Sequence, residues 1–247
     1  MSGKRATGIA AIVGACAALV GCSGAPVDKR PVVRIVEAAQ PSVAIPLGKF
    51  LPNTQELSAT LGTGPNGFMG QLVEGDRDML LRSVGDAEAT PLDCVSTAYR
   101  LQKVAYGAAP VRSVTSSSWM GGGFDGPPVS ASFGVVQMVS AADAQGFFAA
   151  MSEKWRRCNG QSVTLLHPGQ GADEMSRIGD VVFDDRVVSA TVLHASGDTG
   201  SASVSRALGV AGDCIVDVEI TDPRAAGELR PATGVTELIL DKISSQR

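Results

Sequence analysis

The sequence predicts an α+β fold, in which a mainly antiparallel sheet carries helices packed on one face within a single domain. The C-terminal half gives the first observation, because several strand candidates rich in β-branched residues follow one another there. Short turns such as Asp184-Asp185 and Gly212-Asp213 separate them, and short links make neighbouring strands antiparallel. The second observation is the helical spacing of apolar residues in Ser140–Cys158 and near the C-terminus. Helices that are segregated from strands in this way indicate α+β.

The first residues, 1–21, form a predicted signal peptide. Lys4 and Arg5 are a short basic region, and the apolar run from Gly8 to Val20 is too short to span a bilayer. Leu19-Val20-Gly21-Cys22 follows this run and resembles the bacterial lipobox. We therefore expect cleavage before Cys22, a diacylglyceryl anchor on its sulfur, and a lipid-anchored protein on the extracytoplasmic face of the cell membrane. A soluble secreted protein and an uncleaved signal are the alternatives.

The charge of the chain limits its partners. The formal net charge is −4 at pH 7, and it becomes more negative when the signal peptide, which holds Lys4, Arg5 and no acidic residue, is removed. A mildly acidic protein without a lysine or arginine cluster does not attract phosphate backbones. Nucleic acid is therefore excluded as an expected partner.

The mature chain begins with a proline-rich segment. Residues 22–48 contain four prolines and no helical period, which is typical of a lipid-anchored flexible tether. The folded domain is expected at 49–247. Its first helix is capped by Asn53 with Glu56 three residues later, and it stops at Gly62. Residues 64–89 are predicted mainly as a loop.

The remaining elements alternate between strands and helices. Thr90 followed by Pro91 predicts a helix start, and the helix is expected to continue to about Tyr106. Ser140 as N-cap begins the longer helix that ends at Cys158. A last helix is expected from about residue 225 to 244. The predicted strands are residues 111–119, 130–139, 162–166, 175–183, 186–194, 202–210 and 214–220.

Three cysteines of the predicted domain could form disulfides in an oxidising compartment. In the last strand, Cys214 alternates in phase with Val216, Val218 and Ile220, which indicates a buried thiol on the apolar face. Elimination then pairs Cys94 with Cys158. Such a bond would tie the second helix to the end of the third.

Catalytic, cofactor and metal motifs are weak. His167 and His194 have no ligand spacing, so no metal site is expected and each histidine is predicted at an exposed strand end or in a loop. Residues 62–67 match G-x-G-x-x-G but follow a helix, which indicates a loop and no cofactor. Residues 198–201 read Asp-Thr-Gly-Ser, but no second copy exists to form a catalytic pair of aspartates. There is no G-x-S-x-G motif.

Arg206 is the residue that departs from its pattern. It falls on the face of a predicted strand that also carries Val204 and Leu208, where a charge needs a partner. An ion pair with Asp217 or Glu219 is the structural interpretation. A contact with an anionic ligand is the alternative.

The ordered features together resemble a known family. These are the lipobox, the Leu51-Pro52 helix start, Asp93-Cys94, Trp155-Arg156-Arg157-Cys158 and the hairpin from Arg206 to Val218. They resemble the PknH-like extracellular sensor domain over roughly residues 50–245, best known from the outer part of mycobacterial receptor kinases and also found in lipoproteins. The resemblance implies a cleft for an unidentified ligand and a disulfide between the positions of Cys94 and Cys158. Ser205 and Asp222 stand near the positions of the family's second cysteine pair.

The expected function is non-catalytic. The first hypothesis is a membrane-anchored sensor domain that binds a small molecule or an envelope component. A scaffold that binds another envelope protein is the second, and an envelope hydrolase that uses Asp198 or an unrecognised serine is the third and weakest.

Overall fold

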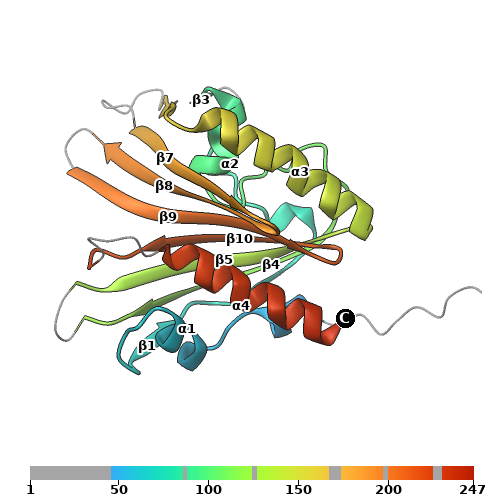
Figure 1. Cartoon of the computed structure of the whole chain (residues 1–247), viewed down its shortest axis with the longest axis vertical. Coiled ribbons are helices and arrows are strands. Elements are labelled where there is room, and N and C mark those ends of the chain that lie inside the picture. Colours follow the sequence, from blue (N-terminus) through green and yellow to red (C-terminus); the bar gives the residue numbers. More distant parts are fainter. Residues whose placement is uncertain (1–45, 86–87, 124–126, 167–173, 197–199, 225–229) are drawn as a thin grey trace, which may run out of the picture. The chain divides into compact units, whose positions relative to one another are not determined.

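One antiparallel sheet is the centre of the fold (Figure 1). The computed structural model describes residues 46–85, 88–123, 127–166, 174–196, 200–224 and 230–247, so the predicted signal peptide and Cys22 lie outside the described residues. Within them, ten strands pair in the order β1-β4-β5-β10-β9-β8-β7-β6-β3, with β2 also paired to β4. The strands are β1 (Gly67–Met69), β2 (Val73–Gly75), β3 (Ala89–Thr90), β4 (Val111–Gly121), β5 (Val129–Met138), β6 (Ser162–Leu165), β7 (Glu174–Asp184), β8 (Val187–Ser196), β9 (Gly200–Ala211) and β10 (Cys214–Thr221).

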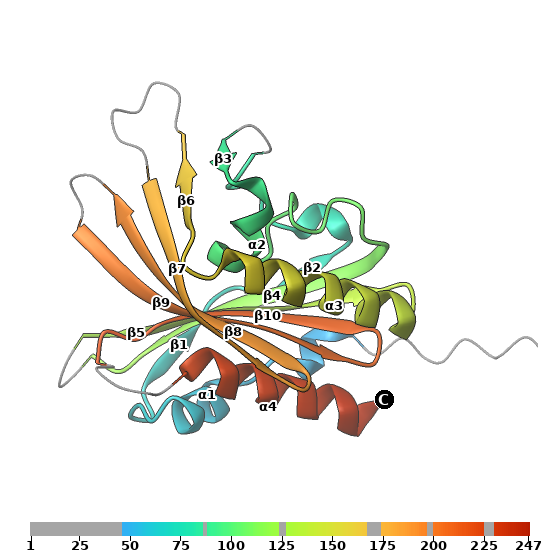
Figure 2. The ribbon, with the colours of Figure 1, turned by 45° about the horizontal axis from the view of Figure 1, so that its top comes forward.

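The α+β class and the antiparallel pairing are confirmed, but the expectation that helices cover one face is wrong. In the described residues the helices are α1 (Thr54–Thr60), α2 (Val95–Ala98), α3 (Ala141–Cys158) and α4 (Pro231–Gln246). Figures 1 and 2 show α3 and α4 on opposite sides of the sheet. The reason lies in strands such as β10, where the successive residues Ile215 and Val216 are both fully buried, one in each of two apolar clusters. A sheet that is apolar on both faces needs cover on both.

The helix α3 follows its prediction closely. The hydroxyl of Ser140 accepts a hydrogen bond from the backbone N–H of Asp143 at 3.1 Å, which satisfies one of the unpaired donors of the first turn. Met151 and Trp155 lie on its buried face. At its end Cys158 forms a disulfide with Cys94, the pair that elimination singled out, and the thiol of Cys214 is free and buried. The disulfide ties α3 to the short 3-10 helix η3 (Leu92–Cys94).

The second predicted helix is wrong in both start and length. Thr90 pairs with Thr164 in the sheet, and the helical part runs only through η3 and α2, to Ala98. Tyr99 is extended, and Leu101 has a positive φ of 50°. The apolar spacing continues to Tyr106, but hydrogen bonds that the backbone of Leu101 and the side chain of Tyr106 make with Asp217 override the helical period there.

Other boundaries differ less. The capping box of Asn53 and Glu56 is present, and Gly62, with a φ of +58°, follows the end of α1. The predicted loop at 64–89 instead contains β1, β2, β3 and the 3-10 helix η2 (Arg77–Met79). The last helix begins at Pro231, where a missing N–H costs nothing, and its predicted start near residue 225 lies outside the described residues. The chain enters the domain through a further 3-10 helix, η1 (Leu47–Phe50).

Candidate functional site

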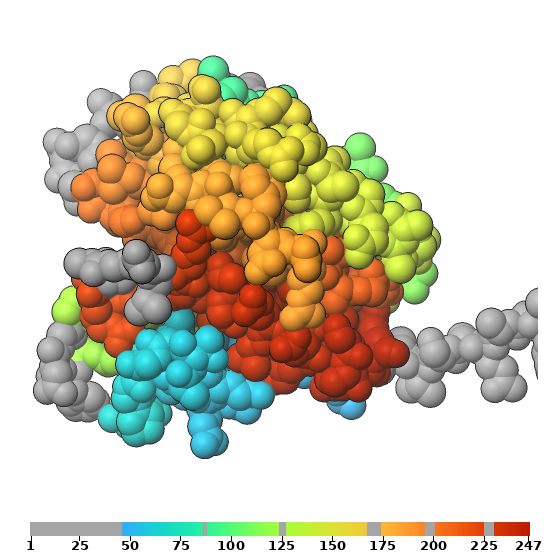
Figure 3. Space-filling view, in the orientation of Figure 1, coloured from blue at the N-terminus to red at the C-terminus, as the bar shows by residue number. Residues whose placement is uncertain are grey.

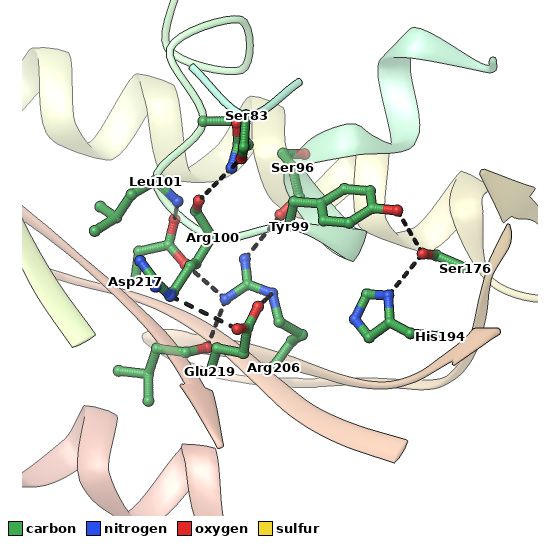
Figure 4. A network of polar contacts seen from close by, with 12 residues as sticks. Ser83, Ser96, Tyr99, Arg100, Leu101, Ser176, His194, Arg206, Asp217 and Glu219 are labelled. Atoms are coloured by element: carbon green, nitrogen blue, oxygen red, sulfur yellow. Dashed lines mark hydrogen bonds and ion pairs between the residues drawn. The ribbon is translucent and has the colours of Figure 1, made fainter. Parts of the chain in front are cut away.

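The sheet divides into two groups of strands along the N-terminal half of β9, which pairs with β8 but not with β10. The pairing of β10 with β9 ends at Ile220 and Ser205, whereas β9 stays paired with β8 as far as Gly200. In Figures 1 and 2 the strands β7, β8 and β9 diverge from β4 and β5 on this side. Ionisable and hydroxyl side chains gather at this point on the α3 face of the sheet (Figure 4). We call them the junction network, and its members are Tyr99, Arg100, Glu174, Ser176, His194, Arg206, Asp217 and Glu219.

Arg206 is the buried centre of the network. Its side chain has no exposed surface, and one terminal nitrogen donates to Asp217 Oδ1 at 2.8 Å and to the carbonyl of Val218 at 2.6 Å. The other donates to the carbonyl of Ser96 at 3.2 Å, at the edge of α2. The guanidinium also lies 5.7 Å from the ring centroid of Trp155. These contacts join β9, β10, α2 and α3, so this geometry gives Arg206 the structural role, and a ligand could not reach it without rearrangement.

Asp217 holds the segment that leaves α2. Its carboxylate accepts hydrogen bonds from the backbone N–H of Leu101 at 2.8 Å and from the hydroxyl of Tyr106 at 3.2 Å, besides the contact with Arg206. Burial, followed by the nearby Asp217 carboxylate, raises the pKa of Tyr106 well above its usual value. The phenol therefore stays protonated and keeps donating. These hydrogen bonds are the physical reason why residues 99–106 do not continue the helix.

The outer part of the network is open to solvent. Arg100 Nε lies 3.6 Å from Glu219 Oε1, and about a quarter of each side chain is exposed. Glu219 Oε2 also lies 3.9 Å from Arg206 Nε, so it connects the buried centre with the surface. His194 and Glu174 are 20% and 32% exposed. We call Arg100, Glu219, Glu174 and His194 the rim.

The hydroxyl groups of Tyr99 and Ser176 hydrogen-bond to two members of the rim, Glu174 and His194. Ser176 Oγ lies 2.6 Å from the hydroxyl of Tyr99 and 2.7 Å from His194 Nδ1, and the Tyr99 hydroxyl donates to Glu174 Oε1 at 3.1 Å. Burial raises the pKa of Tyr99 above its usual value, although the hydrogen bond from Ser176 opposes the shift. Burial also lowers the pKa of His194, while the carboxylates of Glu219 and Glu174 oppose that shift.

Ser176, His194 and Glu174 are the residue types of a hydrolase triad, but their geometry does not fit one. Ser176 is fully buried, so a substrate carbonyl cannot approach its oxygen. The same ring nitrogen of His194 lies 2.7 Å from the serine and 3.7 Å from Glu174, where a triad uses two different nitrogens. The prediction that His194 is an exposed strand-end residue is also wrong, because Tyr99 packs against its ring at 5.4 Å. His167 and Asp198 lie outside the described residues.

A pocket of about 440 Å³ lies at the start of α4, beside the end of α1. Two of its charged groups, Arg224 and Asp222, form an ion pair. Arg224 binds Asp222 at 2.8 Å and donates to the carbonyl of Leu61 at 2.9 Å, which satisfies an orphan carbonyl at the end of α1. The hydrogen bond from the guanidinium of Arg224 lowers the pKa of Asp222. Arg230, also in the lining, donates to Ser189 at 3.1 Å.

The described part of the chain also bears on metal binding and membrane crossing. There, no group of three or more His, Cys, Asp or Glu side chains is arranged to hold a metal ion. The described helices include none that is both long enough and apolar enough to cross a membrane. The G-x-G-x-x-G match runs from the end of α1 to the first residue of β1, as a loop.

Sequence reasoning identified only part of this site. It named Arg206 and its two acidic neighbours from strand alternation, and the fold brings all three together. It missed Tyr99, Arg100, Glu174 and Ser176, which belong to a mispredicted helix or to an ordinary strand pattern. No local signal marked them, because their shared property is proximity in space.

Known proteins share features of the sequence and the fold of this chain. Residues 43–243 match the family model described as PknH-like extracellular domain. The serine/threonine-protein kinase PknJ of Mycobacterium tuberculosis is 31% identical over 110 residues, as is PknJ of Mycobacterium bovis. This stretch is 44% of this chain and only 18% of each kinase, so the chain spans less than a fifth of these relatives. The crystal structure of the extracellular domain of PknH from Mycobacterium tuberculosis superposes with a TM-score of 0.64 at 20% identity, covering 81% of this chain and 95% of that domain.

Proposed function

The chain belongs to the PknH-like extracellular domain family, and we propose that it is an exported, lipid-anchored protein whose sensor-like domain binds a small molecule or an envelope component without catalysis. The family is described as extracellular, which implies an extracytoplasmic location. Two of its relatives are named as serine/threonine-protein kinases, and this similarity supports a sensor-like domain. The observation that carries the proposal is the rim of the junction network.

The rim has the properties of a recognition site. Its four members come from three strands and the segment after α2, and they keep 20% to 32% of their side-chain surface exposed. Both charge signs are present within one small area, and the pKa of His194 is shifted by burial. Ionisable groups that converge with perturbed pKa values are more common at functional sites than elsewhere. The buried pair of Arg206 and Asp217 lies below the rim and contacts it through Glu219, whose Oε2 lies 3.9 Å from Arg206 Nε.

The ligand and its contacts can be tested together. Native mass spectrometry of protein taken from its own envelope should show a bound mass that is absent after unfolding. Arg100→Gln and Glu219→Gln should each weaken that ligand about tenfold or more, because each removes a charge-assisted hydrogen bond.

The control is the ion pair Arg156–Glu153 on the surface of α3, which has the same chemistry outside the network. Arg156→Gln and Glu153→Gln should leave the affinity unchanged. Rim variants that bind the co-purified mass as well as the control variants do would show that the rim is not the binding site.

The lipid anchor is part of the same proposal. Lipobox processing would leave Cys22 at the N-terminus with a diacylglyceryl group joined to its sulfur by a thioether, and the two acyl chains of this group are enough for stable membrane attachment. Cys22→Ala should release the protein from membranes, and the intact mass of the wild-type protein should include a diacylglyceryl group. An intact wild-type mass without a diacylglyceryl group would contradict the anchor.

A scaffold function is the second candidate, and a specific observation favours it. Large apolar side chains are exposed on β1 and at the end of β4, including Phe68 at 82%. Exposed apolar patches mark protein or membrane interaction sites. A hydrolase has less support, because the Ser176 hydroxyl is buried.

A further inference from the structure

Five apolar side chains are exposed together at one edge of the sheet. Phe68 is the most exposed at 82%, Met120 follows at 52%, and the others are between 37% and 49% exposed. We call this set the apolar edge, and its members are Phe68, Met69, Leu72, Val73 and Met120. Four of the five lie within six consecutive positions of the chain.

The register of the strands divides these residues between the two faces of the sheet edge, because successive strand residues point to opposite faces. Phe68, Met120 and Val73 lie on one face, and Met69 points to the other. Phe68 stands directly opposite Met120 in the pairing of β1 with β4, and Val73 of β2 pairs with Ser116 further along β4. β1 ends the strand order of the sheet, and sheet edges in soluble proteins are normally protected by charged residues. Here the sequence from Leu57 to Val73 contains no charged residue. An edge of this composition is suited to an apolar environment.

The chain enters the folded domain beside this edge. The backbone N–H of Gly48 donates to Glu74 Oε1 at 2.7 Å, which links η1 to β2. A methyl group of Leu72 packs over Gly48, so closely that an added Cβ would meet it at 3.1 Å. Lys49 is exposed next to this contact. In Figure 3 the segment that follows residue 46, coloured blue to cyan, forms the lower surface of the molecule beside the red α4.

We propose that the apolar edge rests in the interface of the membrane to which the chain is anchored, with the paired side chains of Phe68 and Met120 among the acyl chains near the headgroups. This inference rests on the proposed anchor at Cys22. Residues 23–45 separate that anchor from the domain and could span at most about 80 Å even if fully extended. The attachment point of the domain lies beside the apolar edge, so tethering holds the edge at high effective concentration near the bilayer. Exposed aromatic and aliphatic side chains next to a lysine are typical of such interfacial contacts.

The test uses Phe68→Trp as a reporter, with Phe183→Trp as its control. Phe183 is an exposed aromatic residue on β7, where the guanidinium of Arg156 lies over its ring at 4.6 Å. Each variant of the lipidated chain is placed on vesicles of phosphatidylcholine and phosphatidylglycerol with or without brominated lipid. In a second arm, the mature chain from Ser23 to Arg247 is held by an N-terminal histidine tag on nickel-chelating lipid.

Brominated lipid should quench the added tryptophan at position 68 several-fold more than the one at position 183, in both arms. Adding Leu72→Ser and Met120→Ser to Phe68→Trp should reduce this quenching while the protein stays attached through its anchor or tag. Equal quenching at positions 68 and 183 would overturn the inference. A blue shift of the tryptophan emission at position 68 without vesicles would also overturn it. A shift that depends on protein concentration would indicate that a second copy covers the apolar edge, and a shift that requires an added protein would indicate a protein partner.

The two arms separate this inference from the proposed function. If the chain from its own host carries no acyl mass while the tagged chain shows selective quenching, the anchor at Cys22 is wrong and the apolar edge is right. If the lipidated chain floats with the vesicles but position 68 is not selectively quenched, the anchor stands and the inference fails.

Discussion

The two faces of the sheet are stabilised by different kinds of interaction. The face under α4 is packed almost entirely with apolar side chains, such as Val216, Val218 and Ile239. The face under α3 encloses a buried arginine and aspartate together with two tyrosines. Apolar packing is tolerant of sequence, whereas a buried ion pair requires each hydrogen bond to be placed. The α3 face is therefore the one whose shape is specified by polar contacts, and it is the one that carries the rim.

The largest expected effect comes from removing one partner of the buried pair. Asp217→Ala would leave the guanidinium of Arg206 buried without its acid, and it would also release Leu101 and Tyr106. Unpairing a buried charge in this way lowers the free energy of unfolding by about 3–5 kcal/mol, measured by urea denaturation.

Arg206→Met combined with Asp217→Leu sharpens this test, because it removes both charges. The double variant should lose clearly less stability than Asp217→Ala alone, since replacing a buried pair by apolar residues is often near neutral. If both proteins lose the same amount, the hydrogen bonds of Asp217 to residues 101 and 106 matter more than the ion pair.

The second-largest loss of stability is expected from removing the disulfide on the same face. Cys94 and Cys158 are 64 positions apart, so their bond restricts the unfolded chain over a long loop. Replacing both by alanine should lower the free energy of unfolding by about 2–4 kcal/mol. A much smaller loss would mean that contacts of α3 with the sheet hold the two segments together without the bond.

A smaller effect is expected on the α4 face, from overpacking. An added Cβ at Gly209 would lie 2.6 Å from Thr236 Cγ2 and 2.9 Å from Leu240 Cδ1, so α4 would have to move. Gly209→Ala should therefore cost about 1–3 kcal/mol. The matched control is Gly179→Ala on β7, where an added Cβ meets no atom within 4 Å, and its effect should stay within about 0.5 kcal/mol. Similar losses for the two variants would contradict the close packing of α4 on β9.

The smallest expected effect is a pH dependence from His194. Burial lowers its pKa in the folded state below the usual value of 6.5, so the unfolded chain binds more protons between these two values. The free energy of unfolding should therefore fall as the pH drops through 6.5 and level off below the folded pKa. His194→Gln should flatten this part of a stability profile recorded from pH 7.5 to pH 4.5. An unchanged slope in that variant would assign the dependence to other groups.

Local patterns predicted many elements because their cause is local. The hydroxyl of Ser140 and the side chains of Asn53 and Glu56 cap helices through neighbours three residues away, so these starts could be found in the sequence. The turn at Gly212-Asp213 and the alternation of β10 could be found for the same reason. The helix predicted to run to Tyr106 failed because Asp217, more than a hundred residues away, binds the backbone of Leu101.

Composition and spacing by themselves predicted an export signal and the antiparallel α+β class. The alternation of residues along single strands also predicted that Cys214 is buried and that Arg206 needs an acidic partner. Each of these depends on residues that are close in sequence or on the period of one strand. Only the tertiary structure decided that helices cover both faces, that Tyr99, Ser176 and His194 meet, and that the apolar edge adjoins the entry of the chain. These relations join segments that are far apart in sequence, and hydrogen bonds and packing between such segments leave no local periodicity to read.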